Sequence, residues 1–368
     1  MNTQSIIWGI GRLGPALQEL ACGRVLLVAD SSLPFLPIKD AVLSSVRSGA
    51  VFDSFRSNPD YGDVCRGLEL FREGGFDSIV AVGGGSAIDV AKCIKLAFMA
   101  EAGEASIVPP LVSQTVEVRE EPCVPLVAIP TTAGTGSEST ANAVHYYNGV
   151  KQTVAHPCIL PDIALLEPSV LDTLPVYQKK CTMMDALCQG IESWWSVAST
   201  PESRGYSRNA IELIMENWRR YIFDADPEAA RNIMLAANYG GRAINIAHTT
   251  AAHAMSYKLG SMFGLPHGHA VAVCLPEIWD FMNEHASAGA KAVFADIAAC
   301  MGASGPECAV SLFREIMSAL GLERPDGGAG REEALETLAS CVNPTRMRNN
   351  PVQLTKEVCK SLYDKILR

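Results

Sequence analysis

Hydrophobic positions in the first half of the chain form short continuous runs. Three such runs, at 24–29, 77–82 and 124–129, each end at an aspartate, a glycine or a proline. Fully apolar runs of this length are typical of strands that are buried on both faces of a parallel sheet. Segments with helical periodicity, such as 64–73 and 86–100, lie between them. This alternation predicts a βαβ domain with a parallel sheet, in which ligands gather at the carboxyl ends of the strands.

The second half of the chain has a different pattern. From Pro175 onward most segments have helical periodicity, and strand-like alternation is sparse. The clearest predicted helices are 179–197, 203–221, 227–246 and 288–301. We therefore expect an α/β dinucleotide-binding domain over 1–172 and an all-α domain over 173–368. A glycine-rich segment at 326–331 is predicted to be a loop before the last helices.

Composition excludes several classes of protein. With 48% hydrophobic and 19% charged residues among 368, the chain is not intrinsically disordered. A net charge of −10 excludes the broad basic surface that nucleic-acid binding requires. Apolar runs fall far short of the roughly 20 residues of a membrane span, so no membrane partner is expected. The N-terminus lacks a signal-peptide pattern and the twelve cysteines form no CxxC, which predicts a cytoplasmic protein with cysteines as small core residues.

Three glycine-rich segments are candidate phosphate loops. The best is 83–86, Gly-Gly-Gly-Ser, because it follows a predicted strand and opens a predicted helix, whose free amides attract a pyrophosphate. The segment 130–138 also follows a buried strand; an ordinary Ser/Thr-rich loop is the alternative. The segment 9–14 matches GxGxxG only formally, and a tight turn into a helix is the alternative. Asp30, at the end of a strand, is placed to bind a ribose diol and to disfavour NADP.

Histidines are few and clustered. Only seven occur in the chain, and His248, His253, His267 and His269 fall within 22 residues. Asp185 and Gln189 are four apart on a predicted helix and so share a face, as do His253 and Tyr257. One aspartate and two histidines form a mixed oxygen and nitrogen donor set. Such a set suits zinc or another divalent transition metal with one position open for substrate.

Several of these segments carry a family resemblance. GGGSAIDVAK, IPTTAGTGSEST, DALCQGIESWWS, HAMSYKLGSMFGLPHGHAVAVCLP and RNNP resemble, in order, the motifs of the iron-containing alcohol dehydrogenase family. The resemblance implies a dehydroquinate synthase-like fold, with a parallel-sheet dinucleotide domain, an all-α domain and the active site in the cleft between them. It also implies NAD as cofactor, with NADP left open, Fe²⁺ or Zn²⁺, an aldehyde or alcohol substrate, and a homodimer or higher homo-oligomer.

The resemblance also assigns site residues. It implies metal ligands at Asp185, His253 and His267, while Gln189 stands where most members have a histidine; three ligands, or a weak fourth through the Gln189 amide oxygen, both stay open. Tyr257 stands where many members have a histidine. Protonation of the product alkoxide is left between water, Tyr257 and His269. The implied cofactor-binding residues are Asp30, Asn58, Gly84, Gly85, Ser86, Asp89, Thr131, Thr135, Asn142 and Lys151.

A narrower resemblance concerns the substrate. CQGIESWWSVASTPESRGYS and the segment from HTTAAHAMSYKLG onward are similar to phosphonoacetaldehyde reductases, which implies reduction of phosphonoacetaldehyde to 2-hydroxyethylphosphonate. A phosphonate needs a cation, for which Lys258, Arg204 and Arg346 are candidates. The alternatives are a general short-chain alcohol or polyol dehydrogenase acting on lactaldehyde, 1,3-propanediol or glycerol, a dehydroquinate synthase-like lyase, and a binding protein without activity.

Overall fold

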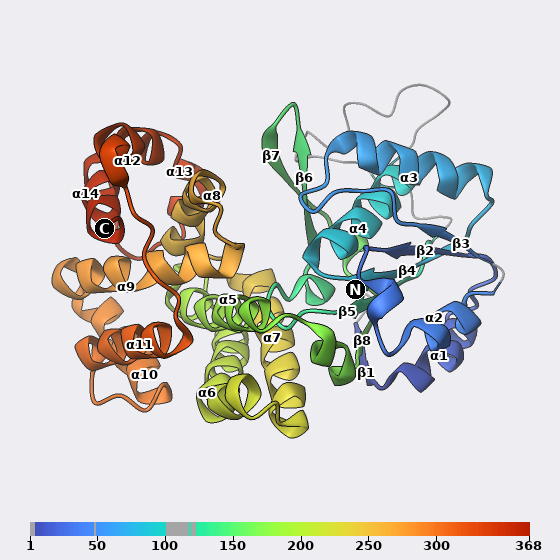
Figure 1. Ribbon diagram of the computed structural model, residues 1–368, viewed down its shortest axis with the longest axis horizontal. Helices are drawn as coiled ribbons and strands as arrows, with labels where there is room; N and C mark the ends of the chain where they lie inside the picture. The colour runs from blue at the N-terminus through green and yellow to red at the C-terminus, as the bar shows by residue number, and fades with distance from the viewer. Residues whose placement is uncertain (1–3, 48, 101–117, 119–122) are drawn as a thin grey trace. The chain divides into compact units, whose positions relative to one another are not determined.

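The chain forms two compact units. A computed structural model describes residues 4–47, 49–100, 118 and 123–368. One unit comprises Met1–Leu174 and the other Pro175–Arg368 (Figure 1).

A parallel sheet lies at the centre of the first unit. Within the described residues it has six strands in the order β1-β8-β5-β4-β2-β3, all parallel. The strands are β1 Ser5–Trp8, β2 Val25–Ala29, β3 Ala50–Phe52, β4 Ser78–Gly83, β5 Leu126–Pro130 and β8 Ile163–Leu166. The three predicted strands are confirmed as β2, β4 and β5, which are buried along their whole lengths. Their carboxyl ends meet at one edge, because parallel neighbours run in register.

Helices cover both faces of this sheet (Figure 1). α3 (Tyr61–Glu73) packs on α4 (Gly85–Met99), which packs on β4 and β5. Alternate strand residues such as Leu26, Ile79 and Leu126 belong to the core beneath these two helices. The other face is covered by α1 and α2, with bounds Leu13–Glu19 and Lys39–Ser45. The sheet is therefore buried on both sides, as its continuous apolar runs predict.

The GxGxxG segment folds as a turn into a helix. Ser5–Trp8 is a strand despite its four residues, and a short 3₁₀ turn, Ile10–Arg12, leads into α1. The backbone amide of Ile10 donates to Oε2 of Glu167 at 2.9 Å. A protein carboxylate thus occupies the amide that a phosphate loop would present to its ligand. The structure favours the turn over a cofactor loop here.

A β-hairpin in the first unit has no counterpart in the predicted elements. β6 (Asn142–Tyr147) and β7 (Val150–Ala155) pair antiparallel around Asn148 and Gly149. Both turn residues have positive φ, 50° and 74°. Asn-Gly is the preferred pair for such a two-residue turn, because both tolerate the left-handed backbone conformation.

The second unit is helical throughout its regular structure. Its helices are α5 Val176–Trp195, α6 Pro201–Phe223, α7 Pro227–Ala247, α8 Ala251–Phe263, α9 His267–His285, α10 Ala288–Cys300, α11 Pro306–Leu320, α12 Arg331–Ser340, α13 Pro344–Met347 and α14 Lys356–Ile366. The predicted helices are confirmed as α5, α6, α7 and α10. α5 lies against α6, α7 and α9, and is buried over most of its length. In the part of the chain that the structure describes, no helix is both long and apolar enough to cross a membrane.

Candidate active site

Three helices of the second unit bring one carboxylate and two imidazoles together. Oδ1 of Asp185 on α5 lies 3.2 Å from Nε2 of His253 on α8 and 3.8 Å from Nε2 of His267, the first residue of α9. One ligand atom from each residue lies within 4.8 Å of the other two. Asp185 and His253 are buried, whereas the His267 side chain is 42% exposed. The donor set fits a divalent iron or zinc ion, with one side open to solvent.

A glycine allows α9 to approach α5 at this point. A methyl group in place of the Gly268 hydrogen would lie 1.9 Å from the carbonyl oxygen of Cys181 and 2.9 Å from Cβ of Asp185. Any larger residue would therefore force the start of α9 away from α5. Gly268 follows His267 directly, so this close contact fixes the distance between His267 and Asp185.

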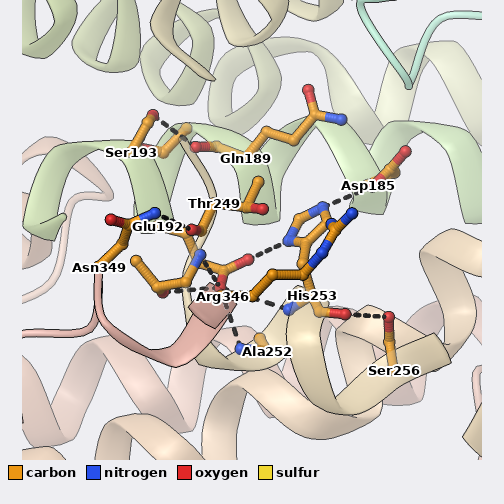
Figure 2. Close-up of polar contacts among 12 residues, drawn as sticks. Asp185, Gln189, Glu192, Ser193, Thr249, Ala252, His253, Ser256, Arg346 and Asn349 are labelled. Carbon is orange, nitrogen blue, oxygen red and sulfur yellow. Dashed lines mark hydrogen bonds and ion pairs between the residues drawn. The ribbon is translucent and has the colours of Figure 1, made fainter. Parts of the chain in front are cut away.

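Glu192, which we did not predict, holds His253 in place. It lies seven residues after Asp185 on α5 and is fully buried. Its carboxylate accepts hydrogen bonds from the amides of Thr250 and Ala252, each at 3.0 Å, and from the Thr250 hydroxyl at 2.7 Å. It also accepts from Nδ1 of His253 (Figure 2). The Nδ1 contact turns Nε2 of His253 toward Asp185, as a carboxylate–histidine–metal arrangement requires.

The titration behaviour of the two buried groups follows from these contacts. Burial alone would raise the pKa of Asp185, but the His267 charge and hydrogen bonds from His253 and Gln189 outweigh it and lower that pKa. Burial alone would lower the pKa of His253, but the Glu192 charge and bonds to Asp185 and Glu192 raise that pKa to about 9. Asp185 is thus an ionised carboxylate, and a bound metal ion would displace the proton from Nε2 of His253.

The Gln189 amide contributes to this site as a hydrogen-bond donor. Its side chain hydrogen-bonds to Asp185 and helps to keep that carboxylate ionised. Its Oε1 faces α7, where a methyl group on Gly240 would lie 3.1 Å away. The amide nitrogen therefore serves Asp185, and the amide oxygen that a fourth metal ligand would use is directed at α7. Gln189 thus contacts Asp185 directly, and its role as a weak fourth ligand stays a prediction.

Tyr257 connects the donor set to an arginine. Its ring stacks on His267 with an interplanar angle of 2° and a centroid distance of 5.6 Å. Nη1 of Arg346 donates to the Tyr257 hydroxyl at 2.6 Å, and the Arg346 Cζ lies 4.9 Å from the Tyr257 ring centroid. The Tyr257 hydroxyl accepts this hydrogen bond, so the hydroxyl proton stays available for another acceptor.

His269 is engaged away from the donor set. Its Nε2 lies 2.8 Å from the carbonyl oxygen of Glu323, and its Nδ1 lies 2.8 Å from the hydroxyl of Tyr177. A carbonyl only accepts, so Nε2 carries the proton and Nδ1 accepts from Tyr177. Burial lowers the pKa of His269 and favours this neutral form. Both nitrogens are used in packing contacts, which does not favour the predicted proton-transfer role.

In the first unit, six of the predicted cofactor residues meet at the strand ends. Asp30 follows β2, and its Oδ2 accepts from the amide of Gly84, which follows β4, at 3.1 Å. Ser86, in the first turn of α4, accepts from the amide of Asn58 at 3.4 Å. A methyl group on Gly85 would lie 3.1 Å from Cγ2 of Thr135, so the loop after β5 reaches the same place. The first amides of a helix have no partner within the helix, so the start of α4 has the geometry that the predicted pyrophosphate site requires.

The other predicted cofactor residues form a second layer behind this loop. Asp89 accepts from Ser137 at 2.7 Å and from the Val144 amide at 3.1 Å, which ties α4 to the following loop and to β6. Lys92, which we did not predict, is fully buried and donates to Ser137, to Thr140 and to the Asn142 carbonyl. Burial lowers the pKa of Lys92 to about 8, against the opposing charges of Asp89 and Glu138. Thr131 is buried after β5, and Lys151 lies on β7 within electrostatic range of Asp89.

The candidate cations are not equivalent. Arg204, on α6, is exposed and donates to the Ser199 hydroxyl at 3.1 Å. Lys258 is next to Tyr257 on α8, but within the described residues its ammonium group makes no hydrogen bond or ion pair with Asp185, His253 or His267. Arg346 alone among these three contacts a residue that stacks on the donor set. Sequence alone does not rank Arg346, on α13, above the other two candidates, because its position depends on the packing of α13 against α8.

Fold and donor set together define the class of protein. A parallel-sheet unit with glycine-rich strand ends is combined with a helical unit that holds an Asp and two His, which is a dehydroquinate synthase-like fold. Residues 4–168 match the family described as iron-containing alcohol dehydrogenase, and residues 180–367 match its C-terminal part. The chain belongs to the iron-containing alcohol dehydrogenase family, and it is therefore an oxidoreductase of the alcohol dehydrogenase type.

Individual relatives span nearly the whole chain. A phosphonoacetaldehyde reductase of Streptomyces viridochromogenes is 33% identical over 94% of this chain and 89% of that protein. An NAD-dependent methanol dehydrogenase of Bacillus methanolicus is 31% identical, over 90% of this chain and 88% of that protein. A solved structure of a 1,3-propanediol oxidoreductase superposes with a TM-score of 0.90 at 27% identity, covering 99% of this chain and 98% of that one.

Proposed function

We propose that the chain is a metal-dependent, NAD-linked aldehyde reductase whose reaction takes place at Asp185, His253 and His267. The observation that carries this proposal is the convergence of these three donors on one point, with one side open. In the bound state the metal ion supplies a Lewis acid for the carbonyl oxygen, and the reduced nicotinamide supplies the hydride. Gln189 orients Asp185 and is not a ligand in this proposal.

The chain's own residues hold this site ready. Glu192 fixes the tautomer and direction of His253, so that Nε2 needs no reorientation when an ion binds. In the net reaction the carbonyl carbon gains a hydride and the oxygen gains one proton, so aldehyde, NADH and H⁺ become alcohol and NAD⁺. We assign the proton donation to the Tyr257 hydroxyl. Its ring stacks on His267, and the hydroxyl oxygen accepts a hydrogen bond from Arg346, which leaves the hydroxyl proton for the product. The proton is then replaced from water.

We propose NAD as the cofactor because of Asp30. Its carboxylate lies at the carboxyl end of β2, where a negative charge disfavours the additional phosphate of NADP. Pyrophosphate binding falls to the amides of Gly85 and Ser86 in the first turn of α4, because the Gly84 amide is held by Asp30; Asn58 and Thr135 lie beside them. The layer of Asp89, Thr131, Asn142 and Lys151 supports this loop. Lys92 belongs to the same layer, because its ammonium group donates to the Asn142 carbonyl.

The cofactor assignment predicts a charge effect at Asp30. Asp30→Asn keeps an oxygen that can accept from the Gly84 amide but removes the negative charge. We expect the ratio of kcat/KM for NADPH to that for NADH to rise by about tenfold or more, because like charges at an interface cost several kcal/mol. Steady-state kinetics with both cofactors measure it. Asp53→Asn, at an exposed position after β3, is the control; an unchanged ratio in Asp30→Asn would exclude Asp30 from cofactor selection.

For the substrate we propose phosphonoacetaldehyde, reduced to 2-hydroxyethylphosphonate. The support is the likeness to the phosphonoacetaldehyde reductase of Streptomyces viridochromogenes and the position of Arg346 beside the donor set. We expect kcat/KM for phosphonoacetaldehyde with NADH to exceed that for propanal and lactaldehyde by at least about tenfold, the value of one hydrogen bond to a charged group. NADH absorbance measures all of these rates, and glycerol oxidation with NAD is followed in the same way.

The same assay separates the rival functions. Equal or faster turnover of the uncharged aldehydes would make the chain a general short-chain alcohol or polyol dehydrogenase. A dehydroquinate synthase-like lyase would show no net change in NADH. A binding protein without activity would hold metal and cofactor yet turn over none of these substrates.

We also propose a cytoplasmic location and a homodimer or higher homo-oligomer. All twelve cysteines, which lie within the described ranges, are thiols, as a reducing compartment requires. The assembly is proposed from the family alone, and light scattering of the purified protein measures it.

A further inference from the structure

The backbone at His248 is unusual for a residue with a side chain. His248 ends α7 with φ 59° and ψ 167°. This region is essentially restricted to glycine, and other residues persist there only where the surroundings hold them, which occurs most often at functional sites. The His248 side chain also lies outside the buried core, so core packing does not account for the residue at this position.

Buried hydrogen bonds hold this segment on both sides. The Ser196 hydroxyl donates to the carbonyl of Ala247 at 2.6 Å, and Glu192 accepts from the amide of Thr250 at 3.0 Å. The Asn349 amide donates to the carbonyl of Thr249 at 3.4 Å. The conformation of His248 is thus imposed from α5 and from the C-terminal segment together.

The C-terminal segment that contributes Asn349 also contributes Arg346. Figure 2 shows both residues among the contacts around Glu192, Thr249 and His253. The Arg346 guanidinium contacts Tyr257, whose ring stacks on His267, so a single ring separates this cation from the donor set. The contact of Asn349 with Thr249 brings the segment that carries Arg346 next to His248. Partial burial and the positive charge of Arg346 both lower the pKa of His248, which agrees with this placement.

We propose that Arg346 and His248 form the binding site for the phosphonate of the substrate, beside the donor set that receives its aldehyde. This inference rests on the proposed function and extends it to named residues. The guanidinium presents paired N–H donors that match the oxygens of a tetrahedral oxyanion. The imidazole, whose backbone is fixed, provides a further N–H donor. A small aldehyde with an anionic end meets both groups, whereas an uncharged aldehyde meets only the donor set.

The first test compares substrates in variants of the full chain. Because Arg346 also donates to Tyr257, the substitution affects both aldehydes, and the ratio of their rates is decisive. Arg346→Met lowers the ratio of kcat/KM for phosphonoacetaldehyde to kcat/KM for propanal by roughly 10- to 100-fold, as expected for lost hydrogen bonds to a charged group. Arg346→Lys keeps the charge but loses the planar pair of N–H donors, so its kcat/KM for phosphonoacetaldehyde lies between those of the wild type and Arg346→Met. Arg204→Met, an exposed arginine on α6, behaves as the wild type. Equal losses for both aldehydes in Arg346→Met would overturn the assignment.

The second test uses the strain at His248. His248→Gly removes the side chain and accepts the same backbone angles, so Tm stays equal or rises while kcat/KM for phosphonoacetaldehyde falls. A fall in Tm together with unchanged preference for phosphonoacetaldehyde would show that His248 serves only structure and would overturn its place in the site.

A binding measurement separates this inference from the proposed function. Isothermal titration of the metal-loaded protein with methylphosphonate is expected to show binding that weakens at least tenfold in Arg346→Met and not in Arg204→Met. No binding to the wild type, or equal binding to both proteins, would overturn the phosphonate site. If no aldehyde is reduced, the proposed function fails, and this titration still decides on the phosphonate site.

Discussion

Replacing Asp185 by alanine is expected to lower kcat/KM for aldehyde reduction about a thousandfold or more. The substitution removes the only carboxylate of the three convergent donors in the described chain and leaves two imidazoles. Lewis-acid polarisation of a carbonyl supplies several kcal/mol to the transition state, and each 1.36 kcal/mol is about tenfold in rate. Steady-state kinetics with NADH measure the loss.

A matched control distinguishes this loss from general damage. Asp296→Ala removes an exposed carboxylate on α10 of the same helical unit and is expected to leave kcat/KM unchanged. Circular dichroism of both variants checks that the helices are retained. Retention of a tenth or more of wild-type kcat/KM by folded Asp185→Ala would place the chemistry elsewhere.

Replacing Glu192 is expected to have the second largest effect. Glu192→Ala leaves the buried donors of Thr250, Ala252 and His253 without an acceptor, so we expect the free energy of unfolding to fall by about 3–5 kcal/mol. Urea unfolding measures it. Glu192→Gln keeps the shape and one acceptor oxygen but loses the charge, and we expect metal affinity to fall by about 10- to 100-fold.

The glutamine variant distinguishes a positioning role from a purely structural one. Competition with a chelator gives the metal affinity of the folded Glu192→Gln protein, and Glu216→Gln, exposed on α6, serves as the control. Wild-type metal affinity in Glu192→Gln would show that Glu192 only stabilises the start of α8, and that His253 is directed by other contacts.

The parts of the fold that could be predicted are those with a strong local pattern. β2, β4 and β5 are continuous apolar runs because they are buried on both faces, and α5 to α7 have clear helical periodicity. β1, β3 and β8 are three or four residues long, which is too short for periodicity to distinguish a strand. The β6–β7 hairpin was predictable in principle, since Asn148-Gly149 between alternating residues is a hairpin signal.

The candidate site divides in the same way. Asp185, His253 and His267 carry ligand chemistry in their side chains, and the structure brings these three together. Glu192 shares the spacing that aligns Asp185 and Gln189 on one face of α5, yet a helical glutamate is normally exposed to solvent. Its role depends on amides at the start of α8, which sequence does not place.

Arg346 and His248 show the limit more strongly. Arg346 is 89 residues from Tyr257 in the chain, and only tertiary packing brings them into contact. The backbone angles of His248 depend on hydrogen bonds that Ser196 and Asn349 donate to the carbonyls of Ala247 and Thr249, the residues on either side of His248. No local pattern in the sequence encodes either arrangement.

The central claim is that Asp185, His253 and His267 hold the metal ion on which activity depends. Metal analysis of purified wild-type protein and of Asp185→Ala, alongside their rates of NADH oxidation, tests it most directly. We predict about one divalent ion per wild-type chain, and an Asp185→Ala protein that lacks both the ion and the activity. Unchanged metal content in Asp185→Ala would contradict the ligand assignment and, with it, the mechanism.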